Sequence, residues 1–145
     1  MQFKLKVKAK TVWSRRMRGV ITDALEYANL HMGLYKHDVK VHIKLSGDPA
    51  ITGLCYDFGS HLLIVIGGHN MLDEEIVETL FHELTHAVQY AEGDLLDVEE
   101  QVVYWRGYNY EGDYDNTESM DYWDAPWEVD ARYQATKYTK TYYQI

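Results

Sequence analysis

The segment from Asp73 to Ala91 carries the clearest helical pattern in the chain. Asp73 fits the N-cap position, Glu74 and Glu75 complement the positive end of a helix, and Gly93 suits a C-terminal stop. The pattern predicts a core helix over 73–91. Its apolar residues form one broad stripe at helical spacing: Ile76, Val77, Leu80, Phe81, Leu84, Ala87, Val88 and Ala91.

Several β-patterns precede this helix. Apolar and polar residues alternate over 3–9 and over 38–46, as in strands with one buried face. The runs 53–58 and 61–66 flank Gly59-Ser60, which predicts a hairpin with Cys55 as a small apolar residue beside it. The unbroken apolar run Leu62 to Ile66 predicts a strand near the sheet centre.

Two further helices complete the expected fold. One covers roughly 15–32, with Ser14 as a candidate cap and Gly33 as a stop, and the other covers roughly 126–142. Between 94 and 125 only Val102 to Trp105 reads as a strand, and the acidic stretch 111–124 reads as a solvated loop. At 145 residues, the sequence predicts a single α+β domain spanning 1–145.

Charge and cysteine content exclude several classes of protein. A net charge of -9 argues against a general nucleic-acid binder. No stretch approaches the roughly 20 apolar residues of a membrane span, and the single Cys55 can form no internal disulfide. We therefore expect a cytoplasmic protein without membrane partners. The sequence does not indicate its oligomeric state.

Basic residues are concentrated near the N-terminus, where Lys4, Lys6, Lys8 and Lys10 alternate with apolar residues. This spacing places the lysines on one face of a strand. The pattern favours protection of a sheet edge against unwanted pairing, and contact with an anionic partner is the alternative.

The string His82-Glu83-Leu84-Thr85-His86 lies inside the predicted core helix. Positions i and i+4 project from the same side of a helix, so both imidazoles can converge on one metal ion. Two imidazoles with a carboxylate and a water form the usual catalytic Zn²⁺ arrangement. Glu83 is angularly offset from the histidines and suits a general base acting on that water, which would attack a carbonyl group.

A third protein ligand must come from elsewhere in the chain. Glu128 begins the last predicted helix, and a crossing helix can present its carboxylate to His82 and His86. Asp130 and Glu92 are the alternatives. Glu92 is disfavoured because Gln89 stands where an extended motif would need a glycine to turn the chain back.

Two segments together resemble a known family. His82-Glu83-Leu84-Thr85-His86-Ala87 and Pro126-Trp127-Glu128-Val129-Asp130-Ala131 are similar to zincin-type metallopeptidases of the gluzincin group, especially small phage and prophage peptidases related to ImmA/IrrE proteins. The resemblance spans roughly 73–140. In the second motif Glu128, Ala131 and Ala135 match, whereas Arg132 replaces the usual Asn.

The resemblance implies a small twisted, mostly antiparallel sheet packed on helices, with an edge strand lining a peptide cleft. It also implies a phage-borne protein acting in the host cytoplasm. The expected activity is zinc-dependent hydrolysis of a peptide or protein substrate, with Glu83 as general base and Zn²⁺ held by His82, His86 and Glu128. The alternative is a catalytically inactive, zincin-like binding or structural protein whose zinc stabilises the fold.

The sequence leaves the group that stabilises the developing oxyanion open. Tyr122, Tyr133, Tyr108 and His69 are weak candidates. For each tyrosine, aromatic packing is the more common role.

Overall fold

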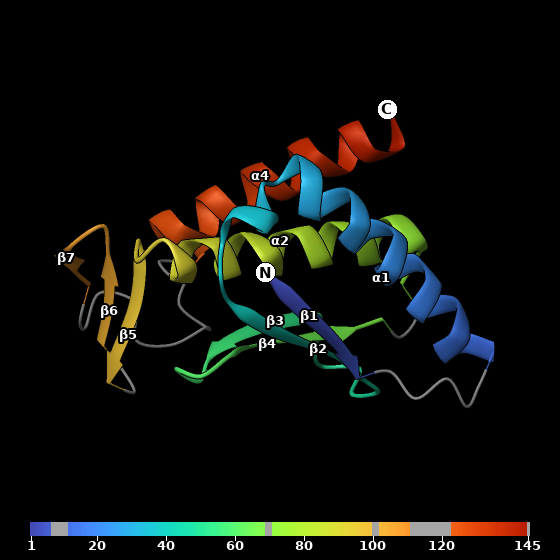
Figure 1. Cartoon of the computed structure of the whole chain (residues 1–145), viewed down its shortest axis with the longest axis horizontal. Helices are drawn as coiled ribbons and strands as arrows, with labels where there is room; N and C mark the ends of the chain where they lie inside the picture. Colours follow the sequence, from blue (N-terminus) through green and yellow to red (C-terminus); the bar gives the residue numbers. More distant parts are fainter. Residues whose placement is uncertain (7–11, 69–70, 100–101, 111–122, 145) are drawn as a thin grey trace.

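The computed structural model describes residues 1–6, 12–68, 71–99, 102–110 and 123–144 (Figure 1). Its long helices are α1 (Val12–His31), α2 (Asp73–Ala91) and α4 (Pro126–Tyr143), and a 3-10 turn, η1, covers Leu34–Lys36. The strands are β1 (Gln2–Lys6), β2 (Lys40–Ser46), β3 (Gly53–Asp57), β4 (Leu62–Gly67), β5 (Leu95–Glu99), β6 (Val102–Trp105) and β7 (Tyr108–Asn109). The expected α+β class is confirmed.

The helices pack on a four-stranded sheet with the strand order β1-β2-β4-β3. Strands β1, β2 and β4 run parallel, and only β3 pairs antiparallel with its neighbour β4. This sheet is mixed, whereas mostly antiparallel strands were expected. The physical reason is that α1 forms the crossover that parallel neighbours need, connecting β1 to β2.

The predicted hairpin and inner strand are confirmed. Strands β3 and β4 are joined through a turn in which Gly59 has φ +82°, a conformation that favours glycine. Strand β4 lies between β2 and β3 and is therefore an inner strand of the sheet. Cys55 is half-buried and pairs with Ile64.

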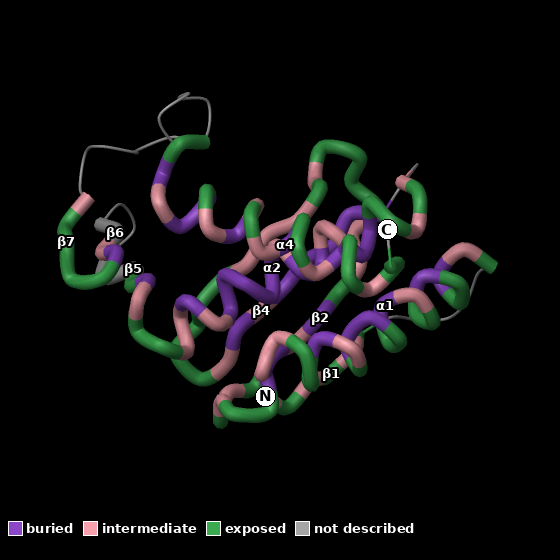
Figure 2. Tube along the Cα trace, turned by 90° about the horizontal axis from the view of Figure 1, so that it is seen from above, coloured by how far each residue is buried: buried purple, intermediate pink, exposed green. Residues whose placement is uncertain are grey.

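The helices lie on one face of this sheet, with α4 across α2 on the side away from the strands (Figure 1). Seen from above, buried residues run through α1, α2 and the middle strands (Figure 2). The core between helices and strands includes Met17, Ile21, Ile43, Ile64, Ile66, Leu80 and Phe81. No helix in the described part of the chain is long and apolar enough to cross a membrane.

Two expected helix caps are wrong. Helix α1 begins at Val12, so Ser14 lies inside it and is buried. Helix α2 has Leu72 at its N-cap without a side-chain hydrogen bond, and Asp73 lies in the first turn, where it pairs with Arg16. The stops are confirmed, since Gly33 and Gly93 adopt φ values of +68° and +76°.

A second, three-stranded sheet, β5-β6-β7, lies beyond the end of α2. Strand β6 was expected, while β5 and β7 were not. Arg106 and Gly107 both have positive φ and form the turn that pairs β6 with β7. Leu95 and Trp105 of this sheet pack with Ala125 and Trp127, which fixes the chain entering α4.

Candidate metal centre

Helix α2 presents His82 and His86 on one side, one turn apart. Their rings meet edge to face with centroids 4.9 Å apart. His86 is buried, and His82 is partly exposed toward a cleft. The broad apolar stripe of α2 holds the helix in the core, so the orientation of both imidazoles is set by packing rather than by a loop.

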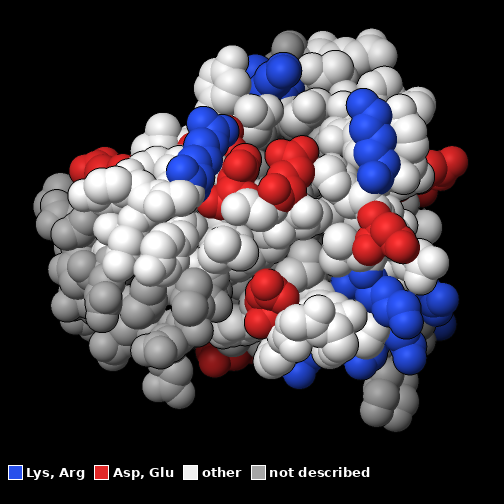
Figure 3. All heavy atoms as spheres, turned by 60° about the vertical axis from the view of Figure 1, so that its left-hand side comes forward, with Lys and Arg blue, Asp and Glu red and all other residues white. Residues whose placement is uncertain are grey.

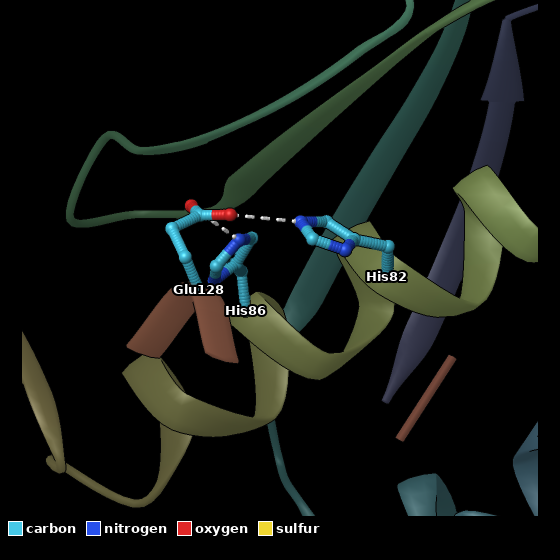
Figure 4. A group of neighbouring side chains, drawn as sticks. All are labelled: His82, His86 and Glu128. Carbon is cyan, nitrogen blue, oxygen red and sulfur yellow. Dashed lines mark hydrogen bonds and ion pairs between the residues drawn. The ribbon is translucent and has the colours of Figure 1, made fainter. Parts of the chain in front are cut away.

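Glu128 reaches these histidines from the first turn of α4. Its Oε2 lies 3.1 Å from Nε2 of His82, and its Oε1 lies 3.0 Å from Nε2 of His86 (Figure 4). Ala131 and Ala135, one and two turns later, are fully buried, and such small side chains allow two helices to approach closely. The packing of α4 on α2 thereby places the carboxylate between the two rings.

The three side chains fit a metal ion. One ligand atom from each of them lies within 4.8 Å of the other two. Bonds of about 2.0–2.1 Å in tetrahedral geometry separate neighbouring ligand atoms by about 3.3 Å, which is within the 4.8 Å that contains the three atoms here. His82, His86 and Glu128 could therefore hold a metal ion, and imidazole with carboxylate suits zinc among other divalent ions.

The other two candidates for the third ligand lie elsewhere. Glu92 follows α2 with a half-exposed side chain, and its Oε1 lies 3.7 Å from Nε2 of His37. Asp130 accepts a hydrogen bond of 2.9 Å from Gln89. Neither carboxylate belongs to the group that could hold a metal.

The ionisation of this group follows from burial and close opposite charges. The two imidazoles overcome the effect of burial and hold the pKa of Glu128 well below its ordinary value. Burial alone would lower the pKa of His86, but the hydrogen bond and charge of Glu128 raise it. A metal binds only neutral imidazoles, so protons compete with a metal for the site.

Glu83 is buried beside this group without joining it. Burial raises the pKa of its carboxyl, against the opposing effect of His86 and His82. A Cβ atom at Gly53 of β3 would lie 2.9 Å from Oε1 of Glu83 and 2.7 Å from Cγ2 of Thr79. Gly53 therefore lets the edge strand approach the Glu83 carboxylate closely, and a larger residue there would displace it.

A cleft of about 520 Å³ opens directly onto His82, Glu83 and Glu128. Thr52 and Gly53 line one side of it, and Arg132 and Trp123 also belong to its lining. The face shown in Figure 3 is hollowed near its centre, where several acidic side chains gather. Two of the three candidate ligands, His82 and Glu128, thus line an open cleft, while His86 is buried behind them.

Arg132 is a cleft residue that the sequence marked only as a departure from a motif. It lies one helical turn after Glu128 on α4, and its Nη1 donates a hydrogen bond of 2.7 Å to the carbonyl oxygen of Trp123. Its guanidinium stacks 3.9 Å above the Trp123 ring. This packing holds a cation on the wall of the cleft that His82 and Glu128 also line. Helical spacing from Glu128 was the one signal that could have identified it.

None of the proposed oxyanion-stabilising residues is brought to the cleft by the described part of the chain. Tyr133 is 65% exposed on α4, and Tyr108 is 60% exposed in the distant β7. Tyr122 and His69 lie outside the described residues, as does the acidic stretch over 111–122.

Gln89 is the second residue that sequence reasoning missed. It is buried one turn after His86, and its Oε1 lies 2.8 Å from Nδ1 of His86. Its Nε2 donates to the carbonyl oxygen of Trp127 at 3.0 Å and to Asp130 at 2.9 Å. When Nδ1–H of His86 donates to Oε1 of Gln89, the Nε2 atom of the same imidazole is left to face Glu128. Gln89 thus orients one ligand and ties α2 to the start of α4.

Replacing Gln89 by Leu is expected to lower metal affinity about tenfold, because His86 loses the partner that fixes its tautomer. Competition with a chromophoric chelator measures this change. Gln134→Leu is the matched control, since the Gln134 amide donates a long hydrogen bond of 3.4 Å to Asp130 and none to His86 in the described part of the chain. Equal affinity in Gln89→Leu and the unchanged protein would show that Gln89 does not orient the ligand.

Comparisons with protein-family models, with curated proteins and with solved structures found no match.

Proposed function

We propose that this protein is a zinc-dependent peptidase whose metal is held by His82, His86 and Glu128. The proposal rests on one observation: the three ligand atoms, the buried Glu83 carboxylate and an open cleft all meet at the same place. The resemblance of the two sequence motifs to gluzincins supports it. A structural metal site has no need of a cleft or of a neighbouring unligated carboxylate.

Bound zinc would supply Lewis-acid chemistry by polarising a substrate carbonyl and lowering the pKa of water. Glu83 would take up the proton of the attacking water and pass it to the leaving amine. Its raised pKa suits this exchange, because a carboxyl group of ordinary acidity is a weaker acceptor near neutral pH. Arg132, held on the cleft wall by Trp123, would donate hydrogen bonds to a substrate oxygen.

The alternative is a binding or structural protein in which zinc only stabilises the fold. The two functions differ in the number of protein ligands, because structural zinc has four and catalytic zinc keeps one open position. Among the described residues, three side chains form the metal-ligating group. This count favours the peptidase.

The test combines metal content, coordination and hydrolysis. Protein purified without chelators is expected to contain about one zinc per chain, with two imidazoles, one carboxylate and one non-protein oxygen in its X-ray absorption spectrum. The zinc-loaded protein should cleave members of a mixed peptide library, as detected by mass spectrometry. The chelator-treated protein should cleave none. Four protein ligands and no cleavage would favour the structural alternative instead.

A further inference from the structure

The four-stranded sheet has a second face that none of the described helices covers (Figure 1). Side chains alternate between the two faces along each strand, so the strand pairing shows which of them lie on this second face. We call this surface the open sheet face. Its side chains are Gln2, Lys4 and Lys6 of β1, Lys40, His42, Lys44 and Ser46 of β2, Leu63 and Val65 of β4, and Leu54 and Tyr56 of β3. Basic side chains occupy its β1-β2 half and apolar side chains its β4-β3 half.

The lysines of this face are more numerous than edge protection requires. Lys6 and Lys44 are direct neighbours across the β1-β2 pair, as are Lys4 and His42. Like charges opposite each other destabilise a sheet, so their placement has a cost. Strand β1 is an edge strand, which explains Lys4 and Lys6. Strand β2 lies inside the sheet, and Lys40 and Lys44 have no such explanation.

No acidic residue balances these charges on the face itself. Among the described positions of β1 to β4 that alternate onto this side, none is Asp or Glu. Lysines two residues apart on a strand are about 6.6 Å apart, and adjacent strands are about 4.8 Å apart. These spacings are shorter than the Debye length of about 8 Å, so the four ammonium groups act together on a polyanion.

A row of rings crosses the sheet beside the lysines. His42 stacks on His61 with centroids 4.4 Å apart, and His61 stacks on Phe58 at 5.3 Å. Tyr56 lies next to Phe58 at 6.1 Å. Phe58 is 58% exposed and Tyr56 is 45% exposed, so flat apolar surface is offered to a ligand.

The pKa of His42 reflects the cations and rings around it on this face. It is lowered first by partial burial and then by the charges of Lys6, His61, Lys4 and Lys40. A neutral imidazole stacks on its neighbour without adding to the charge repulsion.

We propose that the open sheet face binds single-stranded nucleic acid. The lysines of β1 and β2 contact phosphates, while Phe58 and Tyr56 stack on bases. A basic surface next to exposed rings is the combination by which proteins hold single strands without sequence preference. A duplex hides the faces of its bases, and a lipid headgroup or an acidic protein leaves the stacking surface unused.

The charge of the whole chain confines this binding to one face. The net charge of -9 repels a polyanion from most of the surface. In the view of Figure 3 one group of Lys and Arg side chains lies toward the lower right, and others lie elsewhere on this face, one of them beside the acidic centre. The open sheet face lies across the sheet from α2, so the proposal is independent of the peptidase proposal.

Fluorescence anisotropy of the full chain with labelled oligonucleotides of about 20 residues tests this proposal, since that length exceeds the site of one small domain. Oligo-dT and oligo-U are expected to bind, and a duplex of the same length is expected to bind more weakly. Four lysine–phosphate contacts predict that log Kd rises with log salt concentration with a slope of about 3. Similar affinities for oligo-dT and oligo-U would assign the site to both DNA and RNA.

Matched variants separate the contributions that the lysines, the rings and the overall charge make to binding. Lys40→Glu with Lys44→Glu should weaken single-strand binding more than about tenfold, and Phe58→Ala should weaken it about fivefold or more. Lys137→Glu with Lys140→Glu makes the same charge change on exposed positions of α4 and should leave Kd within about twofold. An unchanged circular dichroism spectrum and urea unfolding midpoint show that each variant folds.

Three results would overturn the proposal. They are absence of binding at low salt, equal weakening by the α4 control, and an unchanged Kd in Phe58→Ala. Vesicles containing phosphatidylserine and the polyanion heparin are tested in parallel. Equal or tighter binding to either, insensitive to Phe58→Ala, would assign the face to anions in general rather than to nucleic acid.

Discussion

Replacing Glu83 by Gln is expected to leave zinc binding nearly unchanged and to lower peptide hydrolysis by about a hundredfold to ten-thousandfold. The amide has almost the shape of the carboxylate, so the close approach of Gly53 is retained. It cannot accept a proton at neutral pH. Zinc competition with a chelator and initial rates on a peptide that the unchanged protein cleaves measure the two effects separately.

Glu74→Gln is the control for this change, because it removes the same charge from an exposed position in the first turn of α2. Its hydrolysis rate should equal that of the unchanged protein. Full activity in Glu83→Gln would show that another group is the base. Loss of zinc in Glu83→Gln would instead place Glu83 among the ligands or their supports.

The local part of the fold was predictable from the sequence. The bounds of α2 were predicted as 73–91 because its apolar stripe, its acidic first turn and Gly93 all indicate the same helix. Consistent local signals of this kind make an element easy to recognise. The same helix fixes the relation of His82 to His86, since four residues make about one turn.

Strand direction and the partners of buried polar groups were not predictable. Alternation shows that 40–46 is a strand but says nothing about whether its neighbours run parallel to it. Gln89 and Arg132 contact residues far away in the sequence or on another element, such as Trp127 and Trp123. Such contacts are set by the docking of α4, which no local pattern specifies.

The missed caps have a related cause. Asp73 is a good N-cap by type, yet its carboxylate pairs with Arg16 of α1, and Leu72 takes the cap position. Side-chain preference at a helix end is about 1 kcal/mol, which a tertiary contact can outweigh. Strands β5 and β7 were missed because Leu95–Glu99 includes acidic residues and β7 is two residues long.

Replacing Glu128 by Ala is expected to weaken zinc binding about a hundredfold or more. Loss of a residue that merely supports a ligand already costs about tenfold to a hundredfold, and Glu128 contacts both imidazoles directly. A hundredfold change in affinity reduces the stabilisation that saturating zinc gives the fold by about 2.7 kcal/mol. Chelator competition and urea unfolding with and without zinc measure the two quantities.

The other two candidate ligands provide the controls for Glu128→Ala. Glu92→Ala should bind zinc with unchanged affinity, because its carboxylate pairs with His37 instead. Asp130→Ala should show a smaller loss than Glu128→Ala, since Asp130 acts only by holding Gln89. The three affinities therefore rank the carboxylates by their contribution to zinc binding. A loss in Glu92→Ala as large as that in Glu128→Ala would reverse the assignment. The third ligand would then lie at the end of α2 rather than at the start of α4.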